Sequence, residues 1–207
     1  MSVTTNTPFG FRYYKSLSAV NTQEVLNTYI WDSTAASIYQ DMPVALVATN
    51  ANAPINGYTR IAAAPANGAT VGIVGIARGV KYIDAQGNQR FAKFFLANTP
   101  IKANSWVEVL VSDDPKTMYM CQASGSVANN RMSYNAQILN PGVGDNTTGI
   151  SQAVLDVGNL ATTATLPLKI VGYVAPEKFP GNVNTAAFPV MLVKLNNHTY
   201  GSQVAGF

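Results

Sequence analysis

The chain has 207 residues, of which 47% are hydrophobic and only 11% are charged, and its formal net charge is +3. The apolar content excludes a disordered chain, and the length allows one β-rich domain with a substantial core. Its 13 lysines and arginines are scattered along the sequence, so the charge does not indicate a nucleic-acid-binding face. The most apolar stretch, residues 73–80, is too short to cross a bilayer, so we expect no membrane partner.

Residues 1–20 predict an extended N-terminal arm. Residues 4–8 are polar and turn-prone, and four aromatic side chains follow: Phe9, Phe11, Tyr13 and Tyr14. Burying four aromatic side chains stabilises by about 15 kcal/mol, and ordering some fifteen residues costs about as much. Two interpretations stay open. The aromatic side chains either fold back onto the chain's own core or dock on another subunit, where the arm adds a strand.

Residues 21–207 predict a single all-β domain, a sandwich or barrel of short antiparallel strands with long loops. Residues 21–31 combine a helix-start signal with the strand-favouring Thr28-Tyr29-Ile30-Trp31, and we expect them to be extended. The other expected strands are 37–40, 43–48, 58–62, 71–77, 79–84, 89–95, 106–111, 116–122, 166–174 and 190–195. The segments 79–84 and 89–95 predict a hairpin, because turn residues separate them.

The clearest alternation in the chain is that of Val107, Val109 and Val111, which predicts a strand with one apolar face. The turn residues Asp113-Asp114-Pro115 follow, so we expect 116–122 to return as the partner strand. Residues 124–165 are rich in Gly, Asn and Thr, and we expect them to be largely loop.

Catalytic and metal-binding residues are scarce. The sequence holds one histidine, His198, and one cysteine, Cys121, which together cannot form a zinc or iron site or an intrachain disulfide. Cys121 alternates with Tyr119 along a strand, which favours a buried side chain over a nucleophile. Asp113 and Asp114 fit a turn better than an acid–base or metal pair, because neighbouring strand residues point to opposite faces. We therefore expect that the protein is not an enzyme and that it binds no metal and no cofactor.

Short segments along the chain resemble the capsid decoration (cement) proteins of tailed bacteriophages. The resemblance is carried, in the family's order, by Asn6-Thr7-Pro8-Phe9-Gly10-Phe11-Arg12, by residues 36–44 ("A-I-Y-x-G-D-P-V"), 75–84 ("G-V-F-x-G-C-x-Y-x-D"), 113–123 ("D-D-P-x-T-x-F-x-I-Q-A") and 193–200 ("V-x-I-N-x-H-x-Y"). The sequence departs from this pattern at Gln40, Met42 and Gly79-Val80, which puts strand register in doubt.

The resemblance implies a structural virion protein, made in the host cytoplasm, that lies on the exterior of the assembled capsid. Its partners would be the major capsid protein and itself, as a symmetric homo-oligomer (trimer or dimer). Phe9, Phe11, Tyr13 and Tyr14 would then belong to a capsid or inter-subunit interface. The first ten residues lack a basic and an apolar segment, which fits cytoplasmic synthesis without a secretory signal. The alternative is a phage head fibre or adhesin that binds a glycan, with Tyr134 as the contact residue.

Overall fold

A computed structural model describes residues 4–17, 23–47, 57–66 and 72–201. These ranges contain twelve strands, one short 3-10 helix and no α-helix. The elements are β1 (Arg12–Ser16), β2 (Leu26–Trp31), β3 (Pro43–Leu46), β4 (Arg60–Ala63), β5 (Ile73–Ile83), β6 (Gln89–Ala92), β7 (Glu108–Ser112), β8 (Thr117–Gln122), η1 (Asn129–Arg131), β9 (Asn135–Leu139), β10 (Val154–Ala161), β11 (Leu168–Tyr173) and β12 (Val190–Leu195). The predicted all-β class is therefore confirmed. No helix in the described ranges is long and apolar enough to cross a membrane.

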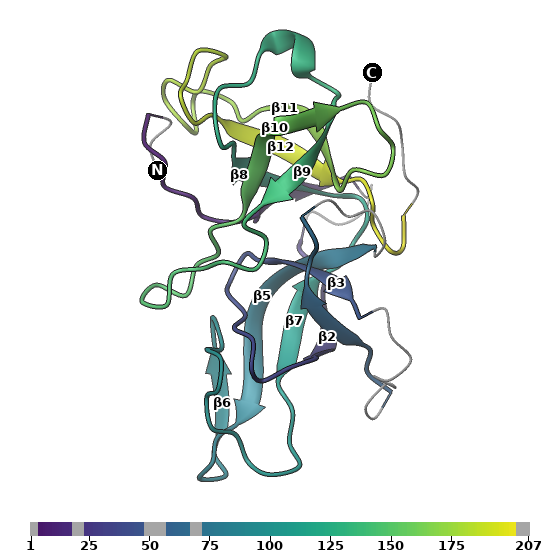
Figure 1. Ribbon diagram of the computed structural model, residues 1–207, viewed down its shortest axis with the longest axis vertical. Helices are drawn as coiled ribbons and strands as arrows, with labels where there is room; N and C mark the ends of the chain where they lie inside the picture. Colours follow the sequence, from purple (N-terminus) through teal and green to yellow (C-terminus); the bar gives the residue numbers. More distant parts are fainter. Residues whose placement is uncertain (1–3, 18–22, 48–56, 67–71, 202–207) are drawn as a thin grey trace.

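Six strands form an antiparallel sheet in the order β1-β8-β12-β11-β9-β10, the upper unit in Figure 1. At its centre, Tyr119 of β8 lies opposite Val193 of β12, and Cys121 lies opposite Met191. Directly opposite residues of paired strands share a face, and all four of these side chains are fully buried. The prediction that Cys121 is a buried strand residue is confirmed.

The lower unit in Figure 1 is a five-stranded barrel in the order β3-β4-β2-β7-β5, closed by pairing of β3 with β5. The barrel is mixed, because β2 and β4 run parallel while its other pairs are antiparallel. The alternating side chains Val107, Val109 and Val111 are buried in the barrel core, as their period of two predicts. The strand β6 extends from β5 as the predicted hairpin and stands at the lower end of the molecule in Figure 1.

The sheet and the barrel share one core. Ile73 and Ile76 at the start of β5 pack in the same cluster as Phe11, Tyr119 and buried residues of the sheet. A short parallel bridge also joins Ile73 to His198 beyond the last strand. The two units therefore form one folded body.

An ionic cluster reinforces the junction between the two units. Arg78 of β5 forms ion pairs with Glu24 and with Asp41, and it donates a hydrogen bond of 3.0 Å to the carbonyl oxygen of Phe11. Burial raises the pKa of Asp41, and the positive charges of Arg78 and Arg12 oppose that shift. This cluster fixes the N-terminal segment against the barrel.

The predicted pairing of 106–111 with 116–122 is wrong. The strand β7 lies in the barrel between β2 and β5, whereas β8 lies in the sheet between β1 and β12. A turn is present at residues 114–117, one residue later than predicted, but it carries the chain from one unit into the other. Local turn chemistry reverses the chain direction, and burial of each strand's faces decides which strand becomes its partner.

Residues 124–165 are largely loop, as predicted, because strands cover only 135–139 and 154–161. The prediction missed both of these strands, β9 and the edge strand β10, and exposed Gly158 and Asn159 lie at the bulge of β10. One further expectation needs correction. Residues 37–40 form only isolated bridges, from Ile38 to Phe95 and from Gln40 to Ile150. Parts of the expected arm and strands, residues 1–3, 18–22, 48 and 71, lie outside the described residues.

Candidate functional site

The N-terminal arm is part of the folded body. The strand β1 pairs with β8, Phe11 is fully buried, and Phe9 packs with Phe179 and Val190 in a smaller apolar cluster. The prediction that Phe9 and Phe11 contact a capsid or sister subunit is corrected, because these side chains fill the chain's own core. The strand β8 supplies a partner inside the chain for one edge of β1.

The other predicted contact residues are tyrosines that lie half-buried. Tyr13 and Tyr14 are in β1, and the Lys178 ammonium lies 4.5 Å from the centre of the Tyr14 ring. The guanidinium of Arg131 lies 4.9 Å from the centre of the Tyr134 ring and covers one of its faces. The roles of Tyr13, Tyr14 and Tyr134 in binding stay predictions.

The two most reactive side chains of the chain are enclosed. Cys121 is fully buried, and burial raises the pKa of its thiol. His198 is 4% exposed, and its Nδ1 accepts a hydrogen bond of 3.0 Å from the backbone amide of Tyr200. Burial lowers the pKa of His198, and the negative charges of Asp113 and Asp114 oppose that shift. Neither side chain is placed to meet a substrate at the surface.

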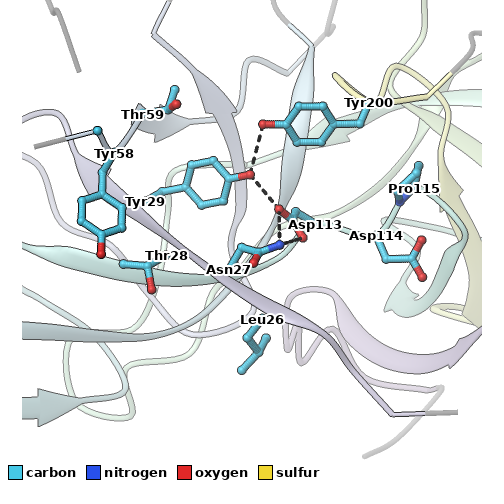
Figure 2. A pocket seen from close by; sticks show the side chains of 11 residues that line it. Leu26, Asn27, Thr28, Tyr29, Tyr58, Thr59, Asp113, Asp114, Pro115 and Tyr200 are labelled. Atoms are coloured by element: carbon cyan, nitrogen blue, oxygen red, sulfur yellow. Dashed lines mark hydrogen bonds between the residues drawn. The ribbon is translucent and has the colours of Figure 1, made fainter. Parts of the chain in front are cut away.

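An open hollow of about 780 Å³ lies where the chain leaves β7 and crosses into the sheet (Figure 2). This volume is in the range of pockets that hold a small ligand or a few side chains of a partner. The hollow is lined by Leu26, Asn27, Thr28, Tyr29, Gly57, Tyr58, Thr59, Asp113, Asp114, Pro115 and Tyr200. Antiparallel pairing of β2 with β7 places Leu26 opposite Ser112 and so brings the start of β2 beside the crossover.

The floor of the hollow is a hydrogen-bonded network around Asp113. Asn27 Nδ2 donates to both carboxylate oxygens, at 2.9 and 3.0 Å, and the Tyr29 hydroxyl donates to Oδ2 at 2.7 Å (Figure 2). The hydroxyl oxygens of Tyr29 and Tyr200 lie 3.2 Å apart. Because the single proton of Tyr29 is directed at Asp113, Tyr200 is the donor in that contact. Burial raises the pKa of Tyr29, and its contacts with Tyr200 and Asp113 add to the shift.

Asp114 adds a second carboxylate to the same wall. Its Oδ2 accepts a hydrogen bond of 2.7 Å from Ser16, and its Oδ1 accepts one of 2.8 Å from the backbone amide of Lys116. Burial raises the pKa of Asp114, but these hydrogen bonds outweigh it and the net shift is downward. Asp114 is therefore ionised at neutral pH. No lysine, arginine or histidine is among the described residues that line the hollow.

The rim of the hollow is apolar and aromatic. Leu26 is 42% exposed, Tyr58 is 41% exposed and Tyr200 is 55% exposed. Exposed Val25 precedes Leu26, and the amide of exposed Leu17 bonds to the carbonyl of Lys116, next to the crossover. Aromatic side chains, tyrosine among them, are enriched at protein-binding surfaces, which suits this rim to contact with a partner.

The sequence predicted the turn at Asp113 and Asp114 but not the hollow. The lining residues come from four segments that are far apart in the chain, and only strand pairing brings them together. The one local signal was a pair of acidic residues with no basic neighbour before residue 116. No group of three or more His, Cys, Asp or Glu within the described ranges could hold a metal ion.

Comparisons of the chain with protein-family models, with curated proteins and with solved structures find no match.

Proposed function

We propose that the chain is a structural virion protein that binds the outer surface of an assembled phage head, acts as a homo-oligomer and bridges subunits of the major capsid protein. The observation that carries this proposal is a set of exposed apolar side chains on a scaffold with few charges. Ten large hydrophobic residues of the described chain are exposed: Leu17, Val25, Leu26, Tyr58, Phe91, Leu139, Val143, Val171, Val183 and Tyr200. Three of them, Leu26, Tyr58 and Tyr200, gather at the rim of the hollow, and grouped exposed apolar side chains support a surface that other subunits cover.

The construction of the molecule supports a mechanical role. The sheet and the barrel share a core, and the Arg78 cluster ties the N-terminal segment to both. A bridge between capsid subunits has to resist separation of its own parts, and a single folded body meets that need. The ordered resemblance to phage decoration proteins supports the specific assignment to a head exterior.

Binding to heads that lack the protein tests the proposal directly. Purified full-length chain is added to such heads, and occupancy is measured by sedimentation and electron cryomicroscopy, with heat-induced DNA release as the readout of stabilisation. We expect saturable binding, a higher release temperature and weak dependence on salt, because apolar contacts are not screened. Heads that bind no chain would refute the proposal.

Four exposed apolar residues in the second half of the chain offer a matched set of variants. Each of Leu139, Val143, Val171 and Val183 is replaced by Asp in turn, since all four are between 41% and 48% exposed and none is needed for the core. At least one substitution should lower head occupancy about tenfold, and the others serve as controls. If none does, apolar docking of these residues on the capsid is wrong.

The glycan-binding alternative is tested on the same protein. A glycan-array signal that is lost in Tyr134→Ala, together with no binding to heads, would favour the head fibre or adhesin over the decoration protein.

A further inference from the structure

The β5–β6 hairpin forms a projecting finger with a fixed shape. Asp84 accepts hydrogen bonds from the backbone amides of Gln86 and Asn88, at 3.1 and 2.8 Å, and from Arg90 Nε at 2.7 Å. These bonds hold the turn, so the hairpin is preorganised for a contact. We call two exposed residues that follow the turn, Phe91 and Lys93, the prong.

Phe91 is the most exposed large hydrophobic side chain of the described residues, at 72%. It lies on an edge strand, because β6 pairs with β5 on one side and with no described strand on the other. Lys93 is exposed two residues further on, whereas Arg90 is paired with Asp84. The prong thus presents an uncovered phenyl ring accompanied by one cation.

The hollow has the complementary chemistry. Its floor carries Asp113 and Asp114, its rim carries the exposed rings of Tyr58 and Tyr200, and no basic side chain among the described residues lines it. Aromatic rings and carboxylates together favour an aromatic side chain accompanied by a cation.

The prong cannot reach the hollow of its own chain. Ser112, next to the hollow, lies beside Ile76 of β5, whereas Arg90, which precedes Phe91 of the prong, lies beside Tyr82 of the same strand. Six residues of strand separate these positions, or about 20 Å at ~3.3 Å per residue. The complementary partner must therefore be presented by another molecule.

We propose that the prong of one copy of this chain inserts into the hollow of a second copy, with Phe91 between the tyrosine rings and the Lys93 ammonium facing Asp113 and Asp114. The contact joins two different surfaces, so it builds either a closed ring or a dimer in which two such contacts are reciprocal. This inference refines the homo-oligomer of the proposed function by naming the interface.

Two variants disable the two halves of the contact separately. Phe91→Glu places a negative charge on the prong, and Tyr58→Lys places a cation at the rim of the hollow. Both side chains are exposed, so folding is expected to persist, and far-UV circular dichroism checks it. Sedimentation velocity across a concentration series gives the association constant of each protein alone and of their equimolar mixture.

We expect the wild-type chain to associate and each variant alone to associate at least tenfold more weakly. The mixture should restore association as a hetero-pair, because the Phe91→Glu copy keeps an intact hollow and the Tyr58→Lys copy keeps an intact prong. A monomeric wild type, an unaffected variant, or a mixture that stays monomeric would overturn the inference. The assay contains no heads, so these outcomes are distinct from a failure of head binding. If the prong contacts only the capsid, Phe91→Glu will lower head occupancy and leave self-association unchanged.

Discussion

Replacing Phe11 by Ala is the sharpest test of the N-terminal segment as core rather than as a docking arm. The side chain is fully buried. The backbone amide of Phe11 donates a hydrogen bond of 2.8 Å to the Asp41 carbonyl oxygen, and its carbonyl oxygen accepts one from Arg78. Phe→Ala in a well-packed core costs about 3–5 kcal/mol, through lost transfer free energy and the cavity left behind. Against a typical unfolding free energy of about 5–15 kcal/mol, this is a large fraction.

Urea unfolding followed by tryptophan fluorescence measures the effect. With a slope of about 2 kcal/mol per molar urea, the midpoint of Phe11→Ala should fall by about 1.5–2.5 M. Val143→Ala is the matched control, because that side chain is 46% exposed and its truncation should change the unfolding free energy by no more than about 0.5 kcal/mol. A Phe11→Ala midpoint as high as that of the control would refute the core assignment and return Phe11 to the interface.

Three further predictions use groups that the fold singles out. Gly10→Ala should destabilise the chain by at least about 2 kcal/mol more than Gly87→Ala in the same urea assay. Both glycines have positive φ, but only a Cβ at Gly10 would lie 2.4 Å from the backbone oxygen of Asp41. His198 is the chain's one histidine, so its imidazole NMR signal should titrate below the ordinary value of 6.5. The folded state then binds fewer protons than the unfolded state, and stability should fall as pH drops below about 6.5, a slope that His198→Asn should remove between pH 5.5 and 7. The Cys121 thiol, buried and with a raised pKa, should react with a thiol reagent at pH 8 only after unfolding, and fast labelling of the folded chain would contradict its burial.

Much of the local structure follows from the sequence because strand periodicity is a property of the backbone. Alternation at Val107, Val109 and Val111 predicts one buried face wherever that strand is placed, and the same argument holds for Tyr119 and Cys121. The sequence also shows that charged residues are scarce and that the chain has one histidine and one cysteine. This composition favours a role in surface contacts over a role in catalysis.

The position of the arm depended on long-range packing. The free energy gained by burying the aromatic side chains of the arm is about equal to the free energy lost by ordering it. The first twenty residues therefore do not show whether Phe9 and Phe11 pack in the chain's own core or on a partner. The free edge of β8, which β1 occupies, decides for the core, and no pattern within the first twenty residues reports that edge.

Composition and alternation by themselves determined the all-β class, the β5–β6 hairpin, the last two strands and the burial of Cys121, because each depends on neighbours within a few residues. Only the tertiary structure decided that β7 and β8 belong to different units, that β2 and β4 run parallel, and that residues 26–29, 57–59, 113–115 and Tyr200 surround one hollow. The physical reason is that a strand's own sequence specifies which face it buries, whereas its partner is selected by burial of all the faces of the fold together.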